Sequence, residues 1–172
     1  YDAKGLLNTA FNDPNPVLFF EHKALYRSIR QEVPLDYYTL PFGKASILKE
    51  GEKLTIITYG AAVHWALDTL EGAELENIEL IDLRSLQPLD KETIINSVKK
   101  TGKALVLTED SLFGSLASEI SAIISEECFE FLDAPVMRLG SGETPIPFAA
   151  ALEEGYLPKK KLKEKLQQLI DY

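Results

Sequence analysis

From Lys44 onward, five short apolar segments alternate with stretches of helical periodicity, and this alternation limits the fold more than any other feature of the chain. The apolar segments lie at residues 45–48, 54–58, 78–83, 104–108 and 136–139. Strands that alternate with helices form βαβ units, in which a mostly parallel sheet is covered by helices on both faces. We therefore expect residues 44–172 to form one three-layer α/β domain around five strands.

The first two apolar segments are too close together for a parallel pair. Only residues 49–53 separate them, whereas a parallel crossover needs a dozen residues or more. We expect these two segments to form an antiparallel hairpin. Segment 45–48 then becomes the single antiparallel edge strand of the sheet.

The helices between the strands are indicated by apolar stripes and by end signals. The stripes are Val63, Ala66, Leu67 and Leu70; Leu116, Ile120, Ile123 and Ile124; and Leu162, Leu166, Leu169 and Ile170. Asp90 is placed as an N-cap, with Leu89 and Ile94 as a hydrophobic staple. The same helix ends at Lys99 and Lys100, followed by Gly102 as a left-handed cap.

Residues 1–43 follow a different pattern. They contain one helical stretch (3–11), a turn (12–16) and one apolar run (17–20) that reads as a buried strand. One helix and one strand cannot bury each other's faces. We therefore expect residues 1–43 to be the end of a preceding α/β domain, followed by a linker over residues 33–43.

Composition excludes several classes of protein. The net charge of −9 argues against a nucleic-acid partner and fits either general solubility or a basic protein partner. Cys128 is the only cysteine, which excludes a disulfide framework and suits a reducing compartment. No apolar run reaches membrane-spanning length, and no signal peptide is present. Because the chain starts with Tyr1 rather than Met, we do not expect a native amino terminus.

Two histidines are candidates for chemistry, and both have simpler interpretations. His64 follows a strand–glycine–helix turn, but there is no serine elbow and no set of zinc ligands around it, so we favour packing or an interface. His22 lies beside Glu21 after a strand end, where α/β sheets often carry function. One histidine next to one glutamate is weak evidence, and we favour a structural or interface role there too.

Loops after the strands supply the remaining candidates. Gly60 opens a helix as a phosphate loop would, but a single glycine fits a tight turn better. The GSGET run (140–144) is either an anion cradle or a plain loop after the last strand. Glu109 and Asp110 end a strand, where paired carboxylates could act in acid–base chemistry. Alternatively, they begin the loop to the next helix, where negative charge favours the helix N-terminus.

Several sequence blocks resemble the beta subunits of 2-oxoacid dehydrogenases, which use thiamine diphosphate. The blocks are NDPNPVLFFEHKALYR (12–27), LTIITYGAAVH (54–64), IELIDLRSLQPLD (78–90), VKKTGKALVLTED (98–110) and the end of the chain (126–172). The resemblance implies a transketolase C-terminal domain over residues 44–172 and the end of a pyrimidine-binding domain over 1–43. The details look closest to the branched-chain (2-oxoisovalerate) enzymes, with pyruvate and acetoin variants open.

The same resemblance implies what the chain lacks. The intact enzyme would decarboxylate a 2-oxoacid on thiamine diphosphate with magnesium and pass the acyl group to a lipoyl group. The activating glutamate and the assisting histidine would precede residue 1, and the magnesium–diphosphate motif belongs to an alpha-type subunit or domain. No position in this chain is therefore expected to be catalytic or cofactor-binding.

A potassium ion is implied at the DPN turn. The family pattern matches the carbonyl of Ala10 and oxygens of Asp13 and Asn15, which suits a hard cation. The alternative is an Asx turn that only caps the helix.

Partners are implied as well: an alpha-type chain, a second beta-type copy, and the basic subunit-binding domain of the lipoyl acyltransferase core. The matching docking groups are Asp133 and Tyr172, although Asp133 could instead cap a turn before Pro135. The implied location is the bacterial cytoplasm or the mitochondrial matrix. The rival interpretations are a transketolase or deoxyxylulose phosphate synthase domain, and a free-standing α/β binding module.

Overall fold

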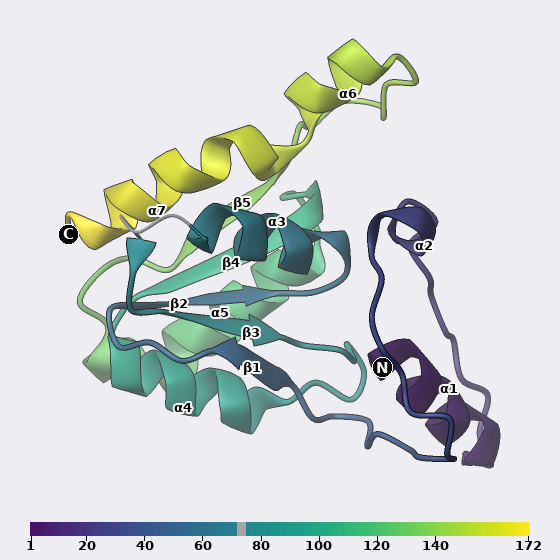
Figure 1. Ribbon diagram of the computed structural model, residues 1–172. Coiled ribbons are helices and arrows are strands. Elements are labelled where there is room, and N and C mark those ends of the chain that lie inside the picture. The colour runs from purple at the N-terminus through teal and green to yellow at the C-terminus, as the bar shows by residue number, and fades with distance from the viewer. Residues whose placement is uncertain (72–74) are drawn as a thin grey trace.

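The computed structural model describes residues 1–71 and 75–172, which form a layered domain with an N-terminal segment beside it (Figure 1). The strands are β1 (Ser46–Lys49), β2 (Leu54–Thr58), β3 (Ile78–Asp82), β4 (Ala104–Ser111) and β5 (Met137–Ser141). The helices are α1 (Asp2–Asn12), α2 (Leu25–Ser28), α3 (Ala61–Leu70), α4 (Lys91–Thr101), α5 (Leu116–Glu127), α6 (Ala150–Tyr156) and α7 (Leu162–Ile170). Short 3-10 turns lie at Phe129–Phe131 and Pro158–Lys161.

The strands form one five-stranded sheet in the order β1-β3-β2-β4-β5. All neighbouring pairs are parallel except β1 with β3. Helices α3 and α7 cover one face of the sheet, and α4 and α5 cover the other (Figure 1). The expected three-layer, mostly parallel α/β fold with one antiparallel edge strand is confirmed.

The predicted hairpin between the first two strands is wrong, because β1 pairs with β3, which lies between β1 and β2. The link from β1 to β2 therefore crosses the start of β3. Gly51 makes this crossing possible, since a Cβ there would lie 2.3 Å from both Glu79 N and Ile78 C. The short spacing indicated an antiparallel strand correctly, but it did not reveal the strand that inserts between the two.

Two hydrophobic layers lie on the two faces of the sheet, and the predicted stripes of α3, α5 and α7 supply part of them. On one face, α3 and α7 contribute Ala62, Ala66, Leu162, Leu166 and Leu169. On the other face, α4 and α5 contribute Ile94, Val98, Ala117, Ile120 and Ile124. The central strands are buried on both faces, as the continuous apolar runs of parallel strands require.

The end signals of α4 are also confirmed. Asp90 caps the helix by accepting a hydrogen bond from Thr93 N at 3.2 Å, and Gly102 ends it with φ of 69°. The Asp90 carboxylate also accepts from Ala45 N at 2.9 Å, so the cap fixes the start of β1 as well. Burial alone would raise the pKa of Asp90, but its hydrogen bonds to Ala45 and Thr93 hold that pKa below the usual value.

The N-terminal segment folds back on itself rather than packing into the sheet. Helix α1 lies along residues 34–40: Leu40 N donates to Gly5 O at 3.2 Å, and Asn8 donates to Tyr38 O at 2.8 Å. The predicted strand over residues 17–20 is wrong, because this run has no regular structure. Leu18 and Phe20 are 84% and 87% exposed, since no neighbouring strand among the described residues pairs with them.

Candidate functional site

The carboxyl edge of the sheet faces the N-terminal segment, and it includes a topological switch point between β2 and β4. The chain leaves β2 toward β3 on one side and returns to β4 on the other, and α/β proteins usually bind ligands in such places. Tyr59 directly follows β2, and Thr108 is the last residue in the continuous buried part of β4. The hydroxyl oxygens of these two residues are 3.0 Å apart. Gly60, with φ of 63°, opens α3 above this point.

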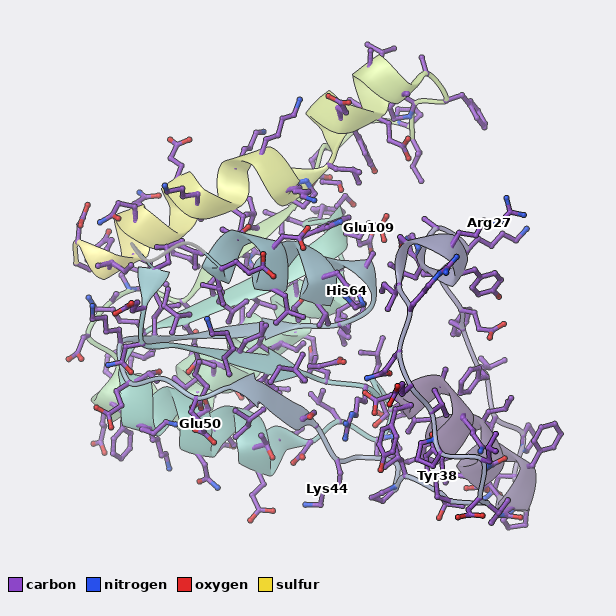
Figure 2. The ribbon with its side chains drawn as sticks, in the orientation of Figure 1. Arg27, Tyr38, Lys44, Glu50, His64 and Glu109 are labelled. Atoms are coloured by element: carbon purple, nitrogen blue, oxygen red, sulfur yellow. The ribbon has the colours of Figure 1, made fainter. Side chains whose placement is uncertain are left out.

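His22 reaches this edge from the N-terminal segment. Its Nε2 lies 3.2 and 3.0 Å from the two carboxylate oxygens of Glu109, which belongs to the extended end of β4 (Figure 2 labels Glu109). His22 Nδ1 is buried without a hydrogen-bond partner among the described residues. The expected interface role of His22 agrees with this contact, which holds the N-terminal segment against the sheet.

A second contact joins the same two parts. Arg84 Nε and Nη2 donate to the two oxygens of Asp2 at 3.0 and 2.9 Å, which is a bidentate pair. Sequence reasoning missed it, because the two residues are 82 positions apart and neither belongs to a motif. Together with the His22 contact, it places the N-terminal segment beside the carboxyl edge.

His64 lies near the half-buried carboxyl group of Asp82. Burial raises the pKa of Asp82, Asp2 adds to that rise, and Arg84 and His64 oppose it. Such a carboxyl group is a candidate acid or base. However, the described residues place no serine elbow, cysteine or third carboxylate with it, so the cluster resembles a structural charge network more than a catalytic site.

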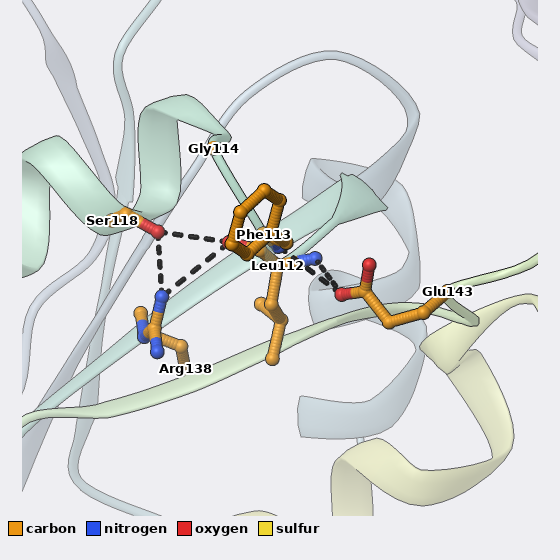
Figure 3. A pocket seen from close by; sticks show the side chains of 6 residues that line it. All are labelled: Leu112, Phe113, Gly114, Ser118, Arg138 and Glu143. Atoms are coloured by element: carbon orange, nitrogen blue, oxygen red, sulfur yellow. Dashed lines mark hydrogen bonds between the residues drawn. The ribbon is translucent and has the colours of Figure 1, made fainter.

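The GSGET run contributes to a shallow cavity of about 630 Å³ at the end of β4, shown in Figure 3. Glu143 accepts hydrogen bonds from the backbone N–H groups of Leu112 and Phe113 at 3.0 and 3.1 Å. Arg138 Nη1 donates to Ser118 Oγ at 2.6 Å on the other side. The GSGET run therefore supplies a carboxylate that accepts hydrogen bonds from two backbone amides. Its first two residues belong to β5 rather than to the loop.

Among the described residues, no group of three or more His, Cys, Asp or Glu side chains is placed to hold a metal ion. At the DPN turn, Asp13 Oδ1 accepts from both Asn15 N (2.9 Å) and Asn15 Nδ2 (3.0 Å), which forms an Asx turn. Ala10 O accepts from Asp13 N at 3.3 Å. The three proposed potassium ligands thus lie within one turn.

The two predicted docking residues lie at the opposite, amino edge of the sheet. Asp133 is exposed, and its backbone N–H donates to Gly102 O at 2.8 Å. Lys103 Nζ donates to Ile170 O at 2.9 Å, near the end of α7 and the exposed Tyr172. Asp133 and the end of α7 are therefore hydrogen-bonded to the adjacent residues Gly102 and Lys103.

Exposed large apolar side chains gather in the N-terminal segment and in residues 142–157. In these two segments they are Tyr1, Leu7, Phe11, Leu18, Phe20, Tyr26, Ile29, Val33, Leu35, Tyr37, Ile146, Phe148 and Leu152. Elsewhere, Phe113, Phe129 and Tyr172 are also strongly exposed. The helical faces of the sheet domain expose few such groups. Surfaces of this kind usually mark protein–protein contacts. In addition, no helix among the described residues is long and apolar enough to cross a membrane.

Comparison with known proteins agrees with this architecture. The family model of the transketolase C-terminal domain matches residues 43–161. The chain is 48% identical to the 2-oxoisovalerate dehydrogenase subunit beta of Bacillus subtilis, over all of this chain and 54% of that protein. It is 47% identical to the pyruvate dehydrogenase E1 component subunit beta of the same organism, over 94% of this chain and 50% of that protein.

A solved structure, described as a split gene transketolase in an inactive beta4 tetramer, superposes with a TM-score of 0.66 and 28% identity over 77% of this chain and 44% of that one. The chain spans about half the length of the curated relatives it matches. The matches cover both the N-terminal segment and the sheet domain. The chain therefore belongs to the transketolase C-terminal domain family, among the beta subunits of 2-oxoacid dehydrogenases.

Proposed function

We propose that this chain is the carboxyl-terminal part of the dehydrogenase component of a 2-oxoacid dehydrogenase complex, and that it serves subunit assembly and docking. Residues 44–172 are the assembly domain, and residues 1–43 are the last part of the pyrimidine-binding domain with its linker. The intact enzyme would decarboxylate a 2-oxoacid oxidatively on thiamine diphosphate and acylate a lipoyl group. The names of the relatives support this class.

The observation that carries the proposal is the exposed apolar surface of residues 1–43. Helix α1 buries only Gly5 and Leu6, while Phe11, Leu18 and Phe20 face solvent. Two contacts with side chains at the carboxyl edge nevertheless hold this segment in a defined place. A segment that is anchored but uncovered is expected to pack against the rest of a larger enzyme.

Cofactors and ions are proposed for the intact enzyme only. Thiamine diphosphate and magnesium would lie between an alpha-type part and the pyrimidine-binding domain. A potassium ion would bind the Ala10 carbonyl and oxygens of Asp13 and Asn15, with further ligands from outside this chain. The hydrogen bonds from Asp13 N to Ala10 O and from Asn15 N to Asp13 Oδ1 bring the three residues together, and the same Asx turn would form without an ion.

The proposed partners are an alpha-type chain, a second beta-type copy and the subunit-binding domain of the acyltransferase core. Asp133 and Tyr172 would bind that basic domain at the amino edge of the sheet. The location of the whole enzyme would be the bacterial cytoplasm or the mitochondrial matrix, as the organisms of the relatives suggest.

The test is the activity of the intact protein with an alpha-type partner. Release of CO₂ from pyruvate and from branched-chain 2-oxoacids is measured with thiamine diphosphate and magnesium, and this chain alone serves as the control. We expect activity only in the complete assembly. A complete assembly that binds thiamine diphosphate but releases CO₂ from neither class of 2-oxoacid would contradict the proposal.

A further inference from the structure

Residues 142–157 form an arm that stands away from the three layers of the domain (Figure 1). The arm is closed at its base by the hydrogen bond from Gly142 N to Tyr156 O, at 3.1 Å. Glu143 attaches it to the end of β4. Helix α6 within the arm has no buried residue, and Phe148 just before it is fully exposed.

The contacts of the arm within the chain do not account for a helix there. Isolated helices shorter than about 12 residues are marginal in water, and α6 has 7 residues without a side-chain cap. Phe148 precedes the N-cap Ala149 and Leu152 lies in the first turn of α6, so two exposed apolar side chains flank the start of this helix. Exposed apolar groups of this kind are stabilised when another surface covers them.

A complementary surface is present in the N-terminal segment. Lys23, Ala24, Tyr26 and Arg27 line a shallow cavity of about 540 Å³ around α2. Neither Lys23 nor Arg27 has a carboxylate partner among residues 1–71 and 75–172. Figure 2 shows the Arg27 side chain pointing away from the sheet into solvent. The cavity is therefore lined by Ala24, by Tyr26, whose hydroxyl donates to Glu21 at 2.8 Å, and by two cations without a carboxylate partner among the described residues.

The arm has the opposite character. Its charged residues are Glu143, Glu153 and Glu154, with no basic residue. Glu143 is bound to backbone amides and Glu154 is paired with Lys160, whereas Glu153 has no side-chain partner in the described part of the chain. The exposed Phe148 and the unpaired Glu153 carboxylate are therefore complementary in charge and character to a cavity that carries unpaired cations.

We propose that the arm of one copy of this chain docks into the α2 cavity of a second copy, with Phe148 in the cavity and Glu153 on Arg27. The proposal rests on the self-association that the proposed function includes. Within one copy, no hydrogen bond or ion pair among the described residues joins the arm to α2. A two-fold axis makes the contact twice and closes the assembly, as most homodimers do.

The test is a charge exchange, measured by sedimentation equilibrium of the chain at low salt. Glu153→Lys and Arg27→Glu, each alone, place like charges together and weaken the dimer by about tenfold or more. The double variant restores the opposite charges and returns the dissociation constant to near the wild-type value. Phe148→Ser weakens the dimer by about thirtyfold, as the loss of a central aromatic contact does.

Glu126→Lys, on the exposed surface of α5, makes the same charge change away from both surfaces and leaves the dimer unaltered. Circular dichroism of each variant establishes that it is folded. A chain that stays monomeric at every concentration overturns the self-association. If the dissociation constant is the same in the two single charge variants, the double variant and Phe148→Ser, this surface is not the interface. If the single variants weaken the dimer but the double variant does not restore it, Glu153 does not pair with Arg27. The CO₂ assay of the proposed function is independent of each of these outcomes.

Discussion

Asp90 joins two parts of the chain through one carboxylate. It accepts hydrogen bonds from Thr93 N and Thr93 Oγ1 at the start of α4 and from Ala45 N before β1. We expect Asp90→Ala to lower the free energy of unfolding by about 2 kcal/mol, because a cap and a buried acceptor are lost. Urea unfolding measures this. Asp90→Asn, which keeps one acceptor oxygen, is the control and should cost less.

The same side chain predicts a pH dependence. The pKa of Asp90 is held below its ordinary value in the folded chain, so its stabilising effect is present above the carboxyl pKa of the unfolded chain. That effect is lost as the pH falls through the lowered folded value. The difference in stability between wild type and Asp90→Ala should therefore shrink in acid. A difference that stays constant from neutral pH down to acid would show that the carboxylate charge plays no part.

Glu79 is a buried carboxylate whose countercharge comes from the surface. Burial would raise the pKa of Glu79, but Lys100 and Ser97 bind it and hold that pKa below its usual value. We expect Lys100→Met to lower the free energy of unfolding by about 2 kcal/mol. This is less than the loss on breaking a fully buried ion pair, because the Lys100 side chain is partly exposed. Thermal unfolding measures this, with Lys91→Met on the same helix as the control. Equal melting temperatures for the two variants would refute it.

At the scale of elements, the link between β1 and β2 passes over the start of β3 at Gly51, where there is no room for a side chain. A Cβ at Gly51 would overlap the backbone of Ile78 and Glu79, so both segments would have to move. We expect Gly51→Ala to destabilise the fold by about 2 kcal/mol or more, the range of overpacked cores. Gly155→Ala in α6 is the control, since nothing lies within 4 Å of a Cβ there, and it should be neutral or stabilising. Chemical denaturation of the two variants gives the comparison.

The elements also show which features the sequence predicts. The α4 cap at Asp90, its end at Gly102 and the helix stripes depend on residues a few positions apart, and all were predicted. The partner of β1 was not, because a strand from another part of the chain inserts beside it. The apolar run at residues 17–20 has a strand's composition but no neighbouring strand to pair with. Pairing depends on the whole fold, whereas caps and stripes depend on local chemistry.

The candidate site was less predictable for the same reason. His22 and Glu109 were each singled out as single residues, and nothing local indicated that they meet across 87 positions. Asp2 and Arg84 carried no signal at all, since an exposed carboxylate and an arginine are common on any surface. The arm at residues 142–157 contains Pro145 and Pro147, which indicate a loop, but its exposure is a property of the folded chain.

At the scale of the whole molecule, the first prediction concerns the cofactor. We expect the chain to bind neither thiamine diphosphate nor magnesium, because the activating glutamate and the diphosphate motif of the family have no counterpart in its sequence. Titration calorimetry with the cofactor and magnesium is the measurement. Saturable binding would mean that residues 1–172 contain an active site that the family pattern does not predict.

A further prediction concerns docking at the amino edge. Asp133→Ala should weaken binding of the basic subunit-binding domain by on the order of 2 kcal/mol, the loss expected when one partner of a desolvated ion pair is removed. The salt dependence of binding should also decrease. A chain lengthened beyond Tyr172, which displaces the terminal carboxylate, tests the second proposed docking group at the end of α7. Glu119→Lys, in the first turn of α5 at the carboxyl edge, is a control on another surface. Surface plasmon resonance at two salt concentrations decides the matter, and unchanged affinity in both variants would remove these residues from the docking site.

The insertion of β3 between β1 and β2 also sets an order of events during synthesis. When β1 and β2 have emerged, neither can pair with the other in the native way, because the place between them belongs to residues not yet made. The β1 edge, with the partly exposed Ile47, stays open until residues 78–82 arrive. An open edge is a template for pairing with other chains. Between the synthesis of β1 and that of β3, the nascent chain therefore presents an additional open strand edge to other chains.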